Sequence, residues 1–574
     1  MLFEINKRDG LARLGKVKTQ HGILDTPTLL PVVNPKILTL SMDELKECGA
    51  QGLITNSYII YKNIELKEVA EEKGVHGLLN WDGPVMTDSG TFQSHVYGEI
   101  DMQPDEILNF QKKIGVDIGT VLDVFCEPET RFEEAKKELE ETQKRIEDSD
   151  KNKGSIFLAA PIQGGRHLDL RLKAAQMASK TGADVFPIGG VVPLMERNNF
   201  EKLAEVIIAS KKGLDISKPV HLFGCGHPML FALASFLGCD LFDSASYAKF
   251  ASRDSLMFTW GTKNLDEIEE MPSEFSAAPG LTANELKEMK KEDRQKIIAK
   301  HNLIVSFAEI RRVKQAIHDG LLWELVENRL RYSPALMKVF DILKREINWI
   351  GEFEPAYRYK TPIKTGTESN WRPLFSKLTN SFKSGDMVHP YFGKVPNHLS
   401  ETYPFHPGLL QDDIEGWKMQ EWNIDRVKTI LDYQFGKGIG KIFTDGETEL
   451  VISRKTKRLR NLLLDGQHVA SLSHRRGMFI LQKRGAELLH ENSSNSMYRV
   501  IVNSETAEFN RKGKSVFCKF IEDIDTELKC LDECIVVNPK DELLAFGKLM
   551  IGPKEIELGQ QGMAVRVRSG IETS

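Results

Sequence analysis

The sequence contains few cysteines and no long hydrophobic run. Its 574 residues include seven cysteines, and the closest spacing, Cys530-x-x-x-Cys534, has no second pair beside it. Scattered cysteines in odd number argue against a disulfide framework and against a zinc knuckle. No apolar stretch is long enough to span a bilayer, and the first residues lack the layout of a signal peptide. We therefore predict a soluble, cytoplasmic protein without a membrane segment.

The chain also lacks an excess of positive charge, because its net charge is −5. This balance argues against a nucleic-acid binder overall, although a local basic patch can still bind phosphates. No glycine-rich phosphate loop follows the first predicted strand. That absence argues against an open, doubly wound dinucleotide-binding sheet.

Up to about residue 345, short apolar runs alternate with longer amphipathic, charged segments. Apolar strands that alternate with helices predict a parallel sheet, and eight of them predict a closed (β/α)8 TIM barrel. An open doubly wound sheet is the alternative. The eight runs are Thr26–Val33, Gly52–Asn56, Pro84–Asp88, Ile118–Asp123, Ser155–Gln163, Val185–Gly190, Val220–Gly226 and Asp240–Asp243.

Polar residues and glycines gather at the carboxyl ends of these runs. Any one of them alone is a common turn former or cap. In a barrel, however, these ends form a single rim, so their recurrence predicts one active site built from distant segments. The two acids at strand ends, Asp88 and Asp243, are the pair that chemistry at a glycosidic bond requires. The residues are Asp88, Asp123, Gln163, Gly189, Gly190, Gly224, Gly226 and Asp243.

The length exceeds what one hydrophobic core supports, so two to four domains are expected. A polar insertion covers 266–300, and His301–Glu327 has the pattern of an amphipathic helix. Five of the seven residues in Arg454–Arg460 are basic. We predict an α/β barrel domain at 1–350, an irregular α+β domain at 351–425, an α+β domain at 426–496 and a β-rich domain at 497–574.

Several motifs, in order along the whole chain, resemble those of the archaeal tRNA-guanine(15) transglycosylases (archaeosine tRNA-ribosyltransferases). The last two look like parts of a PUA RNA-binding domain. The motifs are Met86-Thr-Asp-Ser-Gly-Thr-Phe-Gln93, Gln163-Gly-Gly165, Ile188–Glu196, His221–Pro228, Leu241–Tyr247, His301–Phe307, Leu399–Pro404, Phe509–Lys519 and Val565–Gly570.

The resemblance implies an enzyme that replaces guanine at position 15 of the tRNA D-arm with 7-cyano-7-deazaguanine (preQ0), the first step toward archaeosine. Retention of stereochemistry requires two inversions and thus a covalent ribosyl-enzyme. By resemblance, Asp243 is the nucleophile and Asp88 the general acid/base. The pair is better supported than the division of roles within it.

The resemblance also implies binding residues. Asp123 matches the carboxylate that reads the Watson–Crick edge of the base, and Phe92 and Phe223 match rings that stack on it. Basic residues in the two C-terminal domains would bind tRNA phosphates. The predicted substrate-binding residues are Asp123, Gln163, Gly190, Ser89, Phe92 and Phe223. The predicted RNA-binding residues are Arg454, Lys455, Lys457, Arg458, Arg460, Lys514, Lys519, Arg566 and Arg568.

The sequence departs from the family at its structural zinc. The three positions of the zinc-binding cysteines fall on Ser273, Phe275 and Ala278, and only the histidine, His301, remains. One histidine does not hold a structural zinc. We therefore predict no cofactor, and an apolar plug around Phe275 in place of the metal.

Two other functions fit parts of this pattern. An archaeosine-synthase-like paralogue acting on preQ0-tRNA would have lost the catalytic aspartates and would carry a Pro-Cys motif, which this chain lacks. A non-catalytic tRNA-binding subunit would also have lost the acids. The resemblance implies a homodimer, whereas the sequence itself leaves the oligomeric state open.

Overall fold

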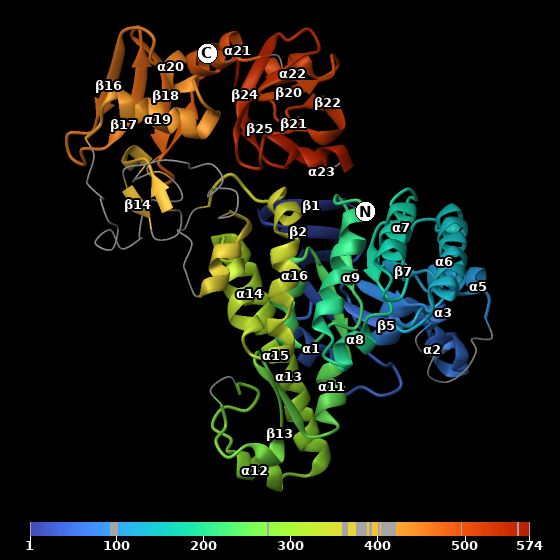
Figure 1. Ribbon diagram of the computed structural model, residues 1–574. Helices are drawn as coiled ribbons and strands as arrows, with labels where there is room; N and C mark the ends of the chain where they lie inside the picture. Colours follow the sequence, from blue (N-terminus) through green and yellow to red (C-terminus); the bar gives the residue numbers. More distant parts are fainter. Residues whose placement is uncertain are drawn as a thin grey trace. The chain divides into compact units, whose positions relative to one another are not determined.

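The computed structural model describes most of the chain, and its contacts divide it into two units (Figure 1). The first unit comprises residues 1–318 and 322–343, and the second comprises 319–321 and 344–574. The described residues are 2–91, 102–272, 275–358, 366–374, 387–389, 393–399, 402, 421–473, 475–494, 496–558 and 562–572.

Eight parallel strands form a closed barrel in the first unit. Two four-stranded sheets, ordered β4-β11-β10-β9 and β5-β6-β7-β8, make up its wall. Parallel bridges from Val32 to Ile54 and from Ala159 to Val185 join the two sheets on both sides. The predicted (β/α)8 barrel is thereby confirmed. The strands are β4 (Thr28–Pro31), β5 (Leu53–Asn56), β6 (Val85–Asp88), β7 (Ile118–Thr120), β8 (Phe157–Ala159), β9 (Phe186–Ile188), β10 (Val220–Leu222) and β11 (Leu241–Ser244).

Amphipathic helices cover the outside of the barrel (Figure 1). In α6, for example, Ala135, Leu139, Thr142 and Ile146 are buried at helical spacing. The exposed charged residues between them are Lys137, Glu140, Glu141 and Lys144. The helices of this part are α1 (Met42–Cys48), α2 (Ser57–Lys62), α3 (Ile64–Leu79), α5 (Pro104–Lys113), α6 (Phe132–Asn152), α7 (Leu168–Ala178), α8 (Val192–Glu196), α9 (Phe200–Gly213), α10 (Pro228–Phe236) and α11 (Ser246–Ala251).

The helix predicted at His301–Glu327 differs in extent. Helix α13 (Lys291–Asp319) begins ten residues earlier, and the chain breaks at Gly320 before α14 (Leu322–Leu330). Gly320 has φ +73°, a left-handed conformation that ends the helix and that glycine adopts without strain. The rest of the polar insertion projects from the barrel (Figure 1). The hairpin before it consists of β12 (Ser255–Phe258) and β13 (Gly261–Asn264). The insertion and the following helices comprise η1 (Leu265–Glu267), α12 (Ala283–Glu288), α15 (Pro334–Met337) and α16 (Val339–Arg345).

An antiparallel sheet of β1 (Leu2–Asp9), β2 (Ala12–Thr19) and β3 (Gly22–Thr26) precedes the barrel. Arg13 on β2 and Asp240, which precedes β11, form an ion pair in which both side chains are 1% exposed. Arg13 also donates to the carbonyl of Lys218 (2.8 Å), and Asp240 accepts the backbone N–H of Val220 (2.8 Å). The pair therefore ties this sheet to the amino ends of β10 and β11.

The second unit contains two larger sheets over one hydrophobic core. The sheet of 448–481 has the order β16-β17-β18-β19, and the C-terminal sheet has the order β21-β25-β24-β23-β20-β22. The elements are α17 (Ile347–Gly351), η2 (Thr367–Trp371), β14 (Met387–His389), β15 (Gly393–Val395), η3 (Asn397–Leu399), α19 (Ile424–Phe435), α20 (Ile439–Ile442), β16 (Thr448–Ile452), β17 (Leu459–Leu464), β18 (Gln467–Ser473), β19 (Met478–Leu481), α21 (Lys483–Asn492), β20 (Arg499–Val502), α22 (Ala507–Arg511), β21 (Val516–Phe517), η5 (Cys518–Phe520), β22 (Ile521–Ile524), β23 (Glu533–Val537), β24 (Leu543–Leu549), α23 (Pro553–Leu558) and β25 (Met563–Gly570).

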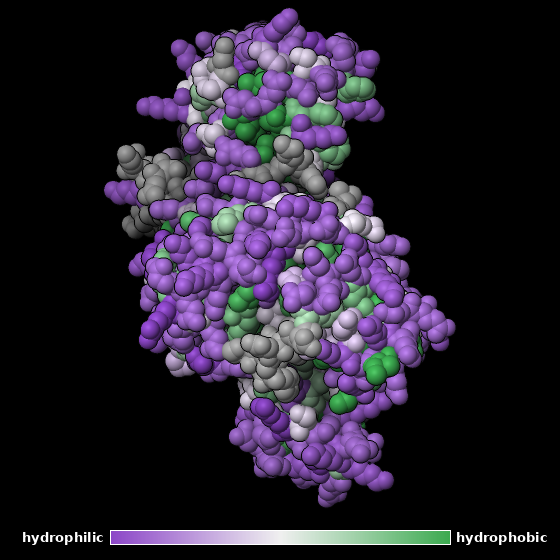
Figure 2. Space-filling view, turned by 90° about the vertical axis from the view of Figure 1, so that its right-hand side faces the viewer, coloured by the Kyte–Doolittle hydropathy of each residue, from purple (hydrophilic) through white to green (hydrophobic). Residues whose placement is uncertain are grey.

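The face shown in Figure 2 is mostly hydrophilic, with hydrophobic residues in small groups. Among the described residues, no helix is long and apolar enough to cross a membrane.

Replacement of Asp240 by Asn is expected to destabilise the barrel by about 3–5 kcal/mol, because it removes the negative charge that is paired with the buried Arg13. The control is Glu4→Gln, which breaks the exposed pair of Glu4 with Lys18 (3.4 Å) and is expected to cost less than about 1 kcal/mol. Thermal unfolding followed by circular dichroism compares the two variants. Equal midpoints would contradict a bracing role for the buried pair.

Candidate active site

Barrel closure brings three aspartates to the carboxyl ends of the strands. Asp88 is the last residue of β6, Asp243 lies in β11, and Asp123 follows β7 by three residues. The negative charges of Asp123 and Asp243 both help to raise the pKa of Asp88, so the three carboxyl groups act on one another electrostatically. The rim predicted from the sequence is therefore a cluster of acids.

Asp88 is half-buried and holds its proton unusually well. Burial raises the pKa of its carboxyl group to about 7, and the charges of Asp123 and Asp243 add to this effect. Asn56 on the neighbouring strand β5 donates its side-chain N–H to Asp88 Oδ2 (3.1 Å). A carboxyl group with a pKa near 7 can both give and take a proton near neutral pH, which general acid/base catalysis requires.

Asp243 has different partners from Asp88, a histidine and a backbone N–H group. His221 Nε2 lies 2.8 Å from Asp243 Oδ1, and the backbone N–H of Gly224 donates to the same oxygen at 2.9 Å. The His221 side chain is fully buried. These two contacts fix one oxygen of Asp243 and leave the other without a hydrogen-bond partner among the described residues.

Asp123 and Gln163 form a second, directly bonded pair. Gln163 Nε2 donates to Asp123 Oδ2 at 2.6 Å, and both side chains are buried. Burial raises the pKa of Asp123, and the bond from Gln163 partly offsets this. The amide oxygen of Gln163 is buried and has no hydrogen-bond partner among the described residues. It is thus an acceptor that a ligand can satisfy.

A buried arginine on α7 holds the loops behind this pair. Arg171 donates to the carbonyls of Gly165 (2.8 Å), Ile162 (2.6 Å) and Gly189 (2.9 Å). The loop that follows β9 needs glycine at position 190, where φ is +67° and a Cβ atom would lie 2.5 Å from the carbonyl oxygen of Cys126. The backbone there consequently approaches Gln163 closely.

Two of the remaining predicted substrate-binding residues, Ser89 and Phe223, lie among the described residues. Ser89 is buried, and its hydroxyl lies 3.2 Å from that of Thr91. Phe223 is half-buried, packs against the barrel core and lies edge-on to the His221 ring, with ring centroids 4.7 Å apart. Phe92 lies outside the described residues.

Three residues of the site were not predicted from the sequence: His221, Asn56 and Arg171. Asn56 ends a predicted strand, so the argument applied to Asp88 would have found it. His221 interrupts an apolar strand, which is a signal for a functional polar residue. Arg171 lies in an amphipathic helix and gave no signal, because its partners are carbonyl groups of other segments.

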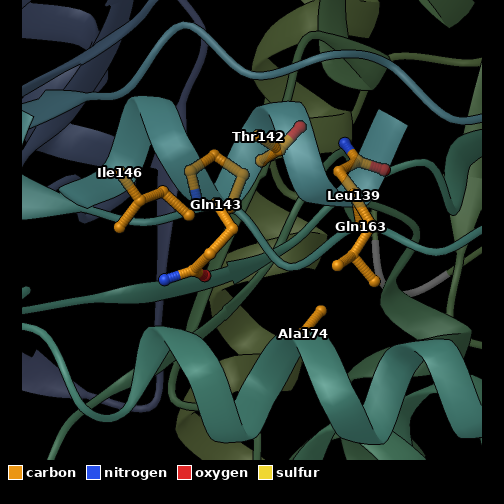
Figure 3. A pocket seen from close by; sticks show the side chains of 7 residues that line it. Leu139, Thr142, Gln143, Ile146, Gln163 and Ala174 are labelled. Atoms are coloured by element: carbon orange, nitrogen blue, oxygen red, sulfur yellow. The ribbon is translucent and has the colours of Figure 1, made fainter. Parts of the chain in front are cut away.

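A small pocket lies between α6 and α7 with Gln163 in its lining (Figure 3). Ala174 of α7 points across it towards the side chains of α6. Its lining contains no carboxylate, and it touches the acid cluster only through Gln163, which donates to Asp123. The residues are Leu139, Thr142, Gln143, Ile146, Pro161, Gln163 and Ala174.

The region around His301 does not fit the zinc site that the resemblance implies. The His301 ring is buried between aromatic rings, with centroids 5.1 Å from Phe275 and 5.2 Å from Phe258, and its Nε2 lies 3.0 Å from the carbonyl of Met257. Burial lowers the pKa of His301 to about 4. Phe275 is buried where a cysteine would stand, and Ala278 offers no ligand atom. Ser273 lies outside the described residues.

The predicted RNA-binding side chains of the second unit are mostly exposed. Those of 454–460 lie at or near the turn between β16 and β17 and have no ion-pair partner within the described ranges. Arg568 differs, because its guanidinium forms two bonds to the buried Glu533 (2.6 and 2.8 Å). That ion pair joins Arg568 to β23, although the residue is still exposed. The exposed residues are Arg454, Lys455, Lys457, Arg458, Arg460, Lys514, Lys519, Arg566 and Arg568.

Gly190→Ala is expected to lower the thermal midpoint of the barrel more than Gly115→Ala does. Both glycines have a left-handed φ, which costs an alanine about 1–2 kcal/mol. Only at Gly190 would the new Cβ also press on neighbouring atoms, because nothing lies within 4 Å at Gly115. Equal midpoints in thermal unfolding would show that the loop moves freely and does not hold Gln163.

Three family models match successive parts of this chain. The family described as queuine tRNA-ribosyltransferase matches residues 8–335, the patch-forming domain C2 of tRNA-guanine transglycosylase matches 425–495, and the PUA domain matches 498–571. The tRNA-guanine(15) transglycosylases of Pyrococcus furiosus and Methanocaldococcus jannaschii are 42% and 38% identical to this chain. The alignments cover 99% and 100% of this chain, and 98% and 100% of the respective relatives. The chain therefore belongs to the queuine tRNA-ribosyltransferase family of tRNA transglycosylases.

Proposed function

We propose that this chain is a tRNA-guanine(15) transglycosylase that replaces guanine at position 15 of the D-arm with preQ0, the first step of archaeosine formation. As a pentosyltransferase, it would break and remake an N-glycosidic bond on tRNA. The main support is the pair of acids on one barrel rim in contrasting environments, with the pKa of Asp88 at about 7 and Asp243 held by His221 and Gly224.

The first half of the reaction uses both acids. A carboxylate oxygen of Asp243 attacks C1′ of the ribose, and the bond from C1′ to the base breaks. The electron pair leaves with guanine, which receives the proton of Asp88. The product is a ribosyl ester of Asp243 on the tRNA, with inverted configuration at C1′.

The second half reverses these steps with a new base. Asp88, now ionised, takes the proton from the ring nitrogen of preQ0, and that nitrogen attacks C1′. The ester bond breaks and returns its electron pair to Asp243, so two inversions give net retention. His221 would act as a positioning residue, because its bond to Asp243 fixes the direction of the carboxylate.

Asp123 and Gln163 would recognise the exchanged base. A carboxylate accepts hydrogen bonds from the adjacent N–H groups that guanine and preQ0 share, and it disfavours a base with acceptors at that edge. The free amide oxygen of Gln163 can accept a further N–H. Both bases must fit the same pocket, since one leaves and the other enters.

The tRNA would be bound by phosphate contacts to the exposed basic side chains of the second unit, such as Arg454, Lys455 and Arg458. Guanine 15 must leave its stacked position to reach an acid at the barrel rim, so binding has to offset the cost of extruding it. A homodimer, a cytoplasmic location and the division of the C-terminal half at 425 and 496 stay predictions.

Exchange of labelled guanine into D-arm tRNA tests this function. Asp243→Asn is expected to lower exchange at least about 10³-fold and to abolish the covalent tRNA–protein adduct on a denaturing gel, while tRNA binding remains. Asp88→Asn is expected to lower exchange by about 10²–10⁴-fold.

The control is Asp82→Asn, an exposed aspartate six residues before Asp88, which is expected to exchange guanine as the wild type does. Full exchange by Asp243→Asn would contradict its role as nucleophile. A wild-type protein that binds tRNA without exchange would favour the tRNA-binding subunit over the enzyme.

Formation of the covalent tRNA–protein adduct, measured without added free base, is expected to slow as the pH rises above about 7. The protonated form of Asp88 is the acid in this half-reaction, and its raised pKa of about 7 sets the midpoint. Asp123→Asn removes one of the charges that raise this pKa and should move the midpoint to lower pH, whatever its effect on the maximal rate. Single-turnover rates across pH measure both midpoints, and identical midpoints would refute the coupling.

A further inference from the structure

A second polar cluster lies at the opposite end of the barrel strands. It consists of His21, in the turn between β2 and β3, His76, in α3, and Asp117, which directly precedes β7. Because Asp117 stands at the amino end of its strand, this cluster is remote from Asp88 and Asp243, which stand at the carboxyl ends. The reaction proposed above makes no use of it.

The two histidines converge on one carboxylate. His21 Nδ1 lies 3.1 Å from Asp117 Oδ1, and His76 Nε2 lies 3.1 Å from Asp117 Oδ2. The two imidazole centroids are 3.7 Å apart. Backbone N–H groups of His21 (3.1 Å) and Val85 (2.9 Å) also donate to Asp117, which fixes its fully buried side chain.

This arrangement offers the ligand atoms that a divalent transition metal takes: two imidazole nitrogens and a carboxylate group, held close together. Neutral imidazole nitrogens together with a carboxylate oxygen are the ligands of zinc and related transition metals, whereas calcium and magnesium select oxygen alone. Among the described residues, His21, His76 and Asp117 form the group whose ligand atoms lie close enough together to share a metal ion.

The spacing is close to that of a metal site. One ligand atom from each of the three residues can be chosen so that all lie within 4.8 Å of one another. Ligands about 2.1 Å from a tetrahedral zinc lie roughly 3.4 Å apart. Rotation of the His21 ring, whose side chain is 34% exposed, can close this difference, while Asp117 stays in place.

We propose that His21, His76 and Asp117 bind one divalent transition metal of the zinc class, with solvent in the remaining coordination position. Such an ion would link the β2–β3 turn, the second half of α3 and the start of β7. It would therefore brace the amino end of the barrel. This site shares no residue with the zinc-binding positions of the family, of which His301 alone remains.

Titration of chelator-treated protein with Co²⁺ tests the proposal, because Co²⁺ bound to nitrogen and oxygen ligands at low coordination number absorbs visible light. The wild type is expected to bind one Co²⁺ that Zn²⁺ displaces. His21→Gln and His76→Gln are each expected to weaken this binding more than about tenfold, since even loss of an outer-shell partner costs about 10–100-fold. Circular dichroism of the metal-free variants confirms that they fold.

The matched control is His490→Gln, which removes a half-buried histidine paired with a single aspartate, Asp541 (3.4 Å), in the second unit. It is expected to bind Co²⁺ as the wild type does. The proposal is overturned if the wild type shows no saturable Co²⁺ binding, or if folded His21→Gln and His76→Gln variants bind the ion with unchanged affinity.

Discussion

The active site depends on closure of the barrel between its first and eighth strands. The register of β4 with β11 pairs Leu30 with Asp243, and the bridge from Val32 to Ile54 continues the sheet to β5 and β6. Since all eight strands run parallel, every carboxyl end faces the same way. Asp88 and Asp243, 155 positions apart in the sequence, thus come to act on one another. Without closure, β6 and β11, which carry the two acids, would lie five strands apart in an open sheet.

Within that rim, the neighbours of each acid divide the chemistry. Burial and the charges of Asp123 and Asp243 raise the pKa of Asp88 to about 7, and a neutral amide from Asn56 donates to its carboxyl group. Asp243 instead lies 2.8 Å from His221 Nε2 and accepts a hydrogen bond from the backbone N–H of Gly224. A pair of acids whose environments differ in this way suits one proton donor and one nucleophile. The pair alone, as seen in the sequence, does not assign these roles.

The barrel and its rim were predictable because both follow from local patterns. Apolar runs predict strands, and the polar residue that ends a run predicts a rim position, as for Asp88 and Gln163. His221 escaped this argument because it lies within an apolar strand, and its partner Asp243 is 22 residues away. The sequence did not identify Arg171 as a site residue, because an arginine in an amphipathic helix is typical of an exposed position. Its burial follows only from its three carbonyl partners in other segments. The sequence did not predict the break between α13 and α14 at Gly320, because the amphipathic pattern continues across it.

The two ends of the barrel serve opposite physical requirements. At the carboxyl end, like charges are crowded together, which costs stability but produces the perturbed acid that the chemistry needs. At the amino end, Arg13 and Asp240 form a pair of opposite charges, and two imidazoles lie within hydrogen-bond distance of Asp117. Each of these contacts joins segments far apart in the sequence, so they hold the strands that carry the acids at their other ends. Where the resemblance implies zinc, this chain has aromatic packing around His301. The contacts of Asp240 and Asp117 lie at the amino end, where a brace leaves the acids free to change charge.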